Sequence, residues 1–197
     1  MAIILQDGKG RGFSAAVTSE NQLFVQSENH PHQHHESAVS GQVYQAGYIM
    51  TGLSASATTN ILHIKNNSAT RNLCVTYIRL SNILAGTLPA ASANFELGFG
   101  MTYASGGSVV TPVQVNRGSG NVADTLVYGN NPTLTGTFER LDYRTIKASG
   151  DEATYNKEGS VILTQGKTLT IRINTDTGNT GQAYARVTFM MIDADET

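Results

Sequence analysis

The sequence predicts an all-β protein, built as an antiparallel sandwich or barrel, with an extended arm at its N-terminus. Strand-like runs follow one another at short intervals from residue 41 onward, and turn-forming residues separate them. Charged residues make up only 14% of the chain, and Ser, Thr, Asn, Gln and Gly take their place. Because Thr favours strands while Gly and Asn favour turns, this composition also indicates β-structure.

The predicted strands contain many β-branched and aromatic residues, and several alternate with period two. They span residues 43–49, 60–66, 73–80, 95–101, 109–115, 134–138, 161–163, 169–173 and 183–192. In the last run, Ala185, Val187 and Phe189 fall on one face. Tyr184, Arg186 and Thr188 fall on the opposite face, so this strand is expected to present two different surfaces.

Two segments depart from the regular strand pattern. Pro112 interrupts the run at 109–115, and because proline has no N–H to donate, this run is expected at a sheet edge or at a bulge. The best helix candidate is 80–93, but Gly86 and Pro89 interrupt it. Helical structure is therefore expected to be minor.

The chain is predicted to divide into an arm, residues 1–40, and a β-sandwich domain, residues 41–197. The arm has too few apolar residues to form its own core, and its clearest element is a hairpin of 15–18 and 22–26. Its apolar side chains, among them Phe13, must be buried elsewhere. We therefore expect a homo-oligomer, most simply a trimer, with fold-back of the arm on its own body as the alternative.

Charge and hydropathy argue against several classes of partner. The net charge is -2 and the pI is about 6.2, without the basic patch that a phosphate backbone requires, so nucleic acid is not an expected partner. No apolar run reaches the roughly 18 residues of a membrane helix. The N-terminus lacks the basic start of a signal peptide, so we expect synthesis in a cytoplasm.

Three stretches of the sequence resemble virion proteins of tailed bacteriophages. They are the opening 17–23, the run 61–68 leading to Arg71-Asn72-Leu73, and the closing 166–173. The resemblance implies a jelly-roll-like sandwich, usually oligomeric and often trimeric, attached to a capsid or tail. It favours a capsid decoration or cement subunit located in the virion, with the major capsid protein or other virion proteins as partners.

The alternative function is a spike or fibre domain that recognises a receptor or glycan on the host. This alternative predicts a shallow polar groove with exposed tyrosines among the loops at 103–108, 128–133 and 174–182.

Enzymatic activity is not predicted, and no catalytic or cofactor-binding residue is assigned. Serines lie mostly in turns, without the Gly-x-Ser-x-Gly pattern of a nucleophile elbow. The acidic residues are scattered in polar stretches and are expected at the solvated surface; examples are Asp142, Asp151, Glu152, Glu158 and Asp176. Cys74 lies inside a strand-like run, which is typical of a small buried hydrophobic residue.

The histidines of the arm raise the question of a metal site, although none is assigned. In an extended chain His30, His32 and His34 project to the same side, and neutral imidazoles bind zinc, copper, nickel or iron. On a threefold axis, two such residues from each chain would supply six nitrogens. The alternative is a solvated polar arm that binds no metal. The acidic tail, residues 193–197, is expected to solubilise the chain end because it lacks the spacing of a calcium loop.

Overall fold

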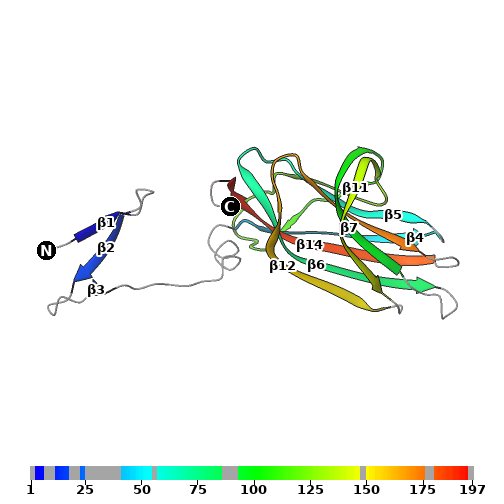
Figure 1. The fold of residues 1–197 in the computed structure, drawn as a ribbon, viewed down its shortest axis with the longest axis horizontal. Coiled ribbons are helices and arrows are strands. Elements are labelled where there is room, and N and C mark those ends of the chain that lie inside the picture. The colour runs from blue at the N-terminus through cyan, green and yellow to red at the C-terminus, as the bar shows by residue number, and fades with distance from the viewer. Residues whose placement is uncertain are drawn as a thin grey trace. The chain divides into compact units, whose positions relative to one another are not determined.

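A computed structural model gives the fold of the chain (Figure 1). The structure describes residues 3–6, 12–17, 23–24, 41–54, 57–85, 93–146, 150–175 and 180–194. The chain separates into two compact units, residues 1–31 and residues 32–197. The described residues form strands and turns without an α-helix, which confirms the all-β prediction. In the helix candidate 80–93, residues 80–85 are strand instead, and residues 86–92 lie outside the described residues.

The first unit contains a small antiparallel sheet in the order β1-β2-β3. Its strands are β1 (Ile3–Gln6), β2 (Gly12–Val17) and β3 (Leu23–Phe24). The pairing of β2 with β3 confirms the predicted hairpin, whereas β1 was not predicted. The predicted boundary at residue 40 stays a prediction, because residues 25–40 lie outside the described residues.

The register of this sheet places apolar residues at positions on one of its faces. Ile3 pairs with Ala15, Leu5 with Phe13, and Val17 with Leu23. Strand residues alternate between faces, so these six positions share one face. The opposite face carries the remaining positions; these are Ile4, Gln6, Gly12, Ser14, Ala16 and Phe24.

The second unit is a sandwich of two antiparallel sheets. A six-stranded sheet has the order β11-β7-β13-β5-β10-β8, and a five-stranded sheet has the order β12-β6-β14-β4-β9. The strands of the first are β5 (Thr58–Asn66), β7 (Ala93–Ser105), β8 (Ser108–Val109), β10 (Thr125–Gly129), β11 (Thr133–Ile146) and β13 (Thr168–Thr175). Those of the second are β4 (Val43–Leu53), β6 (Arg71–Ala85), β9 (Val113–Gln114), β12 (Glu152–Leu163) and β14 (Thr180–Asp193).

The long strands pair in a nested order. The strand β4 pairs with β14, β5 with β13, β6 with β12, and β7 with β11. The first half of the domain therefore folds against the second as one long hairpin, and this hairpin is wound so that successive strands alternate between the two sheets. This is jelly-roll topology, as the resemblance implied.

The core lies between the inner faces of the two sheets. Tyr44 of β4 and Phe189 of β14 are fully buried there, with their ring centroids 5.7 Å apart. As predicted for the last strand, Ala185, Val187 and Phe189 are all buried and Tyr184 and Arg186 are partly exposed. Thr188 is buried as well, at the point where the pairing of β14 with β6 shifts register. Each large apolar side chain buried in such a core contributes roughly 1.5–3 kcal/mol.

Eight of the nine predicted strand runs lie in strands, but in the run 109–115 only residues 109, 113 and 114 are strand. Pro112 has the expected effect. It separates β8 from β9, two-residue strands at the edges of different sheets, so the chain crosses from one sheet to the other at this point. The strand β10 was missed. It is only five residues long and is followed by Asn130 and Asn131, both with positive φ.

A curled ribbon distinguishes the six-stranded sheet. The pairing of β7 with β13 ends at Gly98, but β7 and β11 stay paired beyond it, through residues 99–105 and 133–138. This distal ribbon bends away and lies across the outer face of its own sheet (Figure 1). The Thr168 hydroxyl donates to the Met101 carbonyl at 2.7 Å, which fixes the ribbon to β13.

Gly98 permits the bend because the ribbon packs directly onto its Cα. A Cβ at this position would lie 2.5 Å from Cζ of Phe138 and 2.6 Å from the Glu139 carbonyl oxygen. Irregular pairing between Gly136 and Glu139 adds to the local bend.

We expect Gly98→Ala to destabilise the domain by about 1–3 kcal/mol, because the added methyl group displaces Phe138 or the β11 backbone. Urea unfolding of the purified protein measures this loss. Gly118→Ala is the matched control, since its Cβ would meet only the Asn116 side chain at 3.5 Å, and a change within about 0.5 kcal/mol is expected. Equal stability of the two variants would contradict the packing of the ribbon on Gly98.

Candidate functional site

The outer faces of the two sheets differ, and each contains a candidate site. On the six-stranded sheet, one row of cross-strand neighbours runs Gly98, Thr170, His63 and Tyr128. The curled ribbon covers this row. Tyr103 of the ribbon stacks on Tyr128, with ring centroids 3.7 Å apart and planes inclined by 3°.

His63 is fully buried in this row. Its Nδ1 lies 2.9 Å from the Thr170 hydroxyl, whereas Nε2 has no hydrogen-bond partner in the part of the chain that the structure describes. Burial and the nearby positive charge of Lys65 lower the pKa of His63 from 6.5 to about 4. The imidazole is therefore neutral at pH 7, and a proton on it would be costly.

A charged cluster lies beside this row on the same outer face. The buried carboxylate of Glu96 accepts from Arg172, at 2.5 Å, and from Arg140, at 2.5 Å. The Arg172 guanidinium also lies 3.6 Å from the ring centroid of Phe138, so the cluster holds the ribbon in place. Burial alone would raise the pKa of Glu96, but hydrogen bonds from Arg172 and Asn174 and the two arginine charges outweigh it and lower that pKa. The charges of Glu96 and of the two arginines are thus paired within the cluster, which indicates a structural role.

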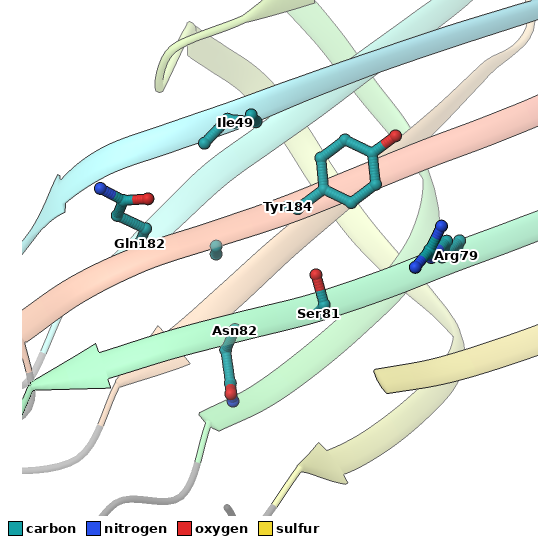
Figure 2. A pocket seen from close by; sticks show the side chains of 7 residues that line it. Ile49, Arg79, Ser81, Asn82, Gln182 and Tyr184 are labelled. Carbon is teal, nitrogen blue, oxygen red and sulfur yellow. The ribbon is translucent and has the colours of Figure 1, made fainter. Parts of the chain in front are cut away.

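The outer face of the five-stranded sheet carries an open groove (Figure 2). Two hollows, of about 400 and about 610 Å³, share Ile49 and Tyr184 and together cross β6, β14, β4 and β9. Ile49 and Tyr184 are joined by other side chains that can contact a ligand. These are Gln45, Arg79, Ser81, Val113, Gln182 and Arg186. Figure 2 shows the Ser81 hydroxyl directed toward the Tyr184 ring and the Asn82 side chain directed away from it.

The groove is positively charged. Arg79 and Arg186 are cross-strand neighbours on β6 and β14. Arg79 forms an ion pair with Glu152 at the border of the groove, but Arg186 has no ion pair within the described part of the chain, and its Nε is buried without a partner. Among the described residues, neither hollow is lined by an acidic side chain.

The structure places the acidic residues singled out from sequence at separate points. Asp142 pairs with Lys157 at 3.2 Å, Glu152 pairs with Arg79, and Asp151 is exposed. The side chain of Glu158 and the whole of Asp176 lie outside the described residues. The described acids thus form ion pairs or face solvent and converge on no common point.

Two further sequence predictions concern Cys74 and the histidines. Cys74 is buried, as predicted, and burial raises the pKa of its thiol to about 11, so the thiol is not reactive at neutral pH. His30, His32 and His34 lie outside the described residues. Within the described ranges, no group of three or more His, Cys, Asp or Glu side chains is placed to hold a metal ion.

The loops proposed for ligand binding are only partly brought together. Residues 103–108 and 128–133 do meet, since Ser105 pairs with Thr133 and Ser108 with Gly129. Tyr103 and Tyr128 stack on each other there, and neither hollow of the groove is lined by residues of these two loops. Residues 176–179 of the third loop lie outside the described residues. The sequence analysis did not predict the groove on the sheet face. The pattern that could have indicated it is the alternation that places Tyr184 and Arg186 on the same face of the last strand.

Comparison with known proteins adds no family. No protein-family model matches the chain, and no curated protein matches its sequence. Among the described residues there is no helix long and apolar enough to cross a membrane.

We expect the stability of the domain to fall as the pH drops from about 6.5 to about 4. In this window the unfolded chain binds a proton at His63 and the folded chain does not, so acid favours unfolding by roughly 2–3 kcal/mol. Urea unfolding at pH 7 and pH 4.5 measures the loss. The His63→Gln variant keeps a polar group near Thr170 but cannot titrate, so it should lose less stability between the two pH values. An identical loss in both proteins would show that His63 does not contribute to it.

Proposed function

We propose that this chain is a structural subunit of a virus particle, a capsid decoration or cement protein. The observation that carries the proposal is the separate N-terminal sheet, whose register gathers apolar positions on one face. The resemblance of the sequence to virion proteins of tailed bacteriophages supports the same function.

The N-terminal sheet is too small to be stable by itself. Its strands have only 4, 6 and 2 residues, and a sheet of this size needs a surface to pack against. Burial of side chains such as Leu5 and Phe13 against a neighbouring subunit would supply roughly 1.5–3 kcal/mol each. The edge strands β1 and β3 also offer main-chain groups to which a neighbour can add a strand.

The second unit provides a suitable body for such a subunit. Jelly rolls occur in viral capsid proteins and in lectins, but a fold by itself does not assign a function. The low proportion of charged residues gives a surface of hydroxyl and amide groups that tolerates contact with either water or protein.

Attachment through the first unit can be tested by deletion. We expect a chain without residues 1–40 to fold, because the described core of the second unit lies entirely between residues 43 and 192. The assay uses particles that have been freed of this protein and that bind the full chain again. The truncated chain should not co-sediment with these particles. Full occupancy by the truncated chain would contradict the proposal.

Point variants sharpen this test. Leu5→Asn changes the apolar face of the sheet, whereas Ile4→Asn changes the adjacent position on the opposite face. Leu5→Asn should weaken particle binding at least tenfold relative to Ile4→Asn.

The proposal includes assembly of the free protein into a homo-oligomer, most simply a trimer. Closed rotational symmetry would bury the apolar face of every copy equally. Light scattering of the purified protein should give a mass near three times the 21.0 kDa of one chain. A mass of one chain, with residues 13–25 protected from proteolysis, would instead support an arm folded back on its own body.

The second candidate function is a spike or fibre domain that binds a receptor or glycan. The open, positively charged groove on the five-stranded sheet favours it. Because the two units are distinct, particle attachment and ligand binding are compatible in one chain.

A further inference from the structure

Arg186 in the groove has no ion pair within the described part of the chain, which favours an anionic ligand at this position. The stem of Arg186 lies over Gly47, where a Cβ would meet Cβ and Cγ of Arg186 at 3.3 Å. Among the residues that the structure describes, the buried Nε of Arg186 has no acceptor. Its cross-strand neighbour Arg79 is paired with Glu152. A buried donor without a partner is costly, and a carboxylate is the acceptor that a guanidinium binds best.

The groups around Arg186 match the chemistry of a sugar ring. The Tyr184 ring lies between Ile49 and Arg79 (Figure 2), and Ile49 is 57% exposed, so a non-polar ring face can pack here. Ser81, Gln182 and Gln45 supply a hydroxyl and two amides for hydrogen bonds to sugar hydroxyls. The groove thus combines an apolar platform, neutral polar groups and one unpaired cation.

The position of the groove argues against an extended peptide. Within the groove, β6 and β14 are paired on both sides, whereas β4 pairs with β9 only at Tyr44 and Gln45. A peptide bound by strand addition would lie beside the remaining edge of β4 and would not cover β6 and β14. Recognition over β6 and β14 must therefore come from side chains.

We infer that the outer face of the five-stranded sheet binds an acidic sugar, with its carboxylate on Arg186 and its ring against Tyr184. This site lies in the second unit and does not depend on the particle-binding function proposed for the first. It also differs from the loop site expected from sequence, since strand side chains form it.

Isothermal titration calorimetry of the full chain tests this inference. The probes are an oligomer of galacturonic acid and sialyllactose, and the neutral controls are an oligomer of galactose and lactose. Saturable binding of at least one acidic probe is expected, at least tenfold tighter than its neutral counterpart and weaker at high salt. If neither acidic probe binds saturably, or if the neutral sugars bind equally well, the inference is wrong.

Variants locate the binding. Arg186→Gln and Tyr184→Ala should each weaken binding of the acidic probe at least tenfold. Arg117→Gln removes the same charge from an exposed turn outside the groove and should bind like the original chain. Unchanged binding by Arg186→Gln, in a variant whose thermal unfolding matches that of Arg117→Gln, would overturn the site.

Two further experiments distinguish a sugar ligand from a protein partner, and sugar binding from particle binding. An Asp- and Glu-rich peptide that binds saturably and depends on Arg186, while both acidic sugars fail, would assign the groove to a protein partner and overturn the inference. Deletion of residues 1–40 should leave sugar binding unchanged, and Arg186→Gln should leave particle binding unchanged. Failure of one function is thereby distinguished from failure of the other.

Discussion

The nested pairing of the chain is the constraint on which the rest of the structure depends. Six ladders connect the long strands, and every one of them joins a strand of residues 43–105 to a strand of residues 133–193. Neither half therefore has a partner for its strands within itself. Contacts between residues so far apart in sequence are slow to form, and they make the body fold as a single cooperative unit.

The curled ribbon makes the two outer faces unequal. On the six-stranded sheet the ribbon covers the row that contains the buried His63 and Thr170, and its Phe138 packs on Arg172, so that face is used for internal packing. No comparable ribbon lies over Ile49 and Tyr184 on the other sheet, among the residues that the structure describes, and the groove stays open there. One short bend at Gly98 thus determines which face of the sandwich is available to other molecules.

The sequence predicted what depends on local pattern and missed what depends on distant contacts. Alternation of apolar and polar residues identified most strands, and it placed Tyr184 and Arg186 on the same face. The strand β10 was too short for any such pattern. The bend at Gly98 depends on Phe138, forty positions later, and Arg79 meets Arg186 only through strand pairing, so neither could be read from spacing. The jelly-roll topology itself came from resemblance, because alternation does not specify which strands are neighbours.

The two ends of the sandwich offer different opportunities for engineering. Val43, where β4 begins, lies beside Met190 near the end of β14, so the chain enters and leaves the sandwich at one end. The connections that follow Leu53, Ala85 and Ile146 leave from the opposite end, beside Gly181, Thr180 and Ala93 respectively. A foreign epitope fused to the C-terminus would therefore emerge next to the root of the N-terminal segment. An epitope spliced into one of the opposite connections would be displayed a full strand length away from it.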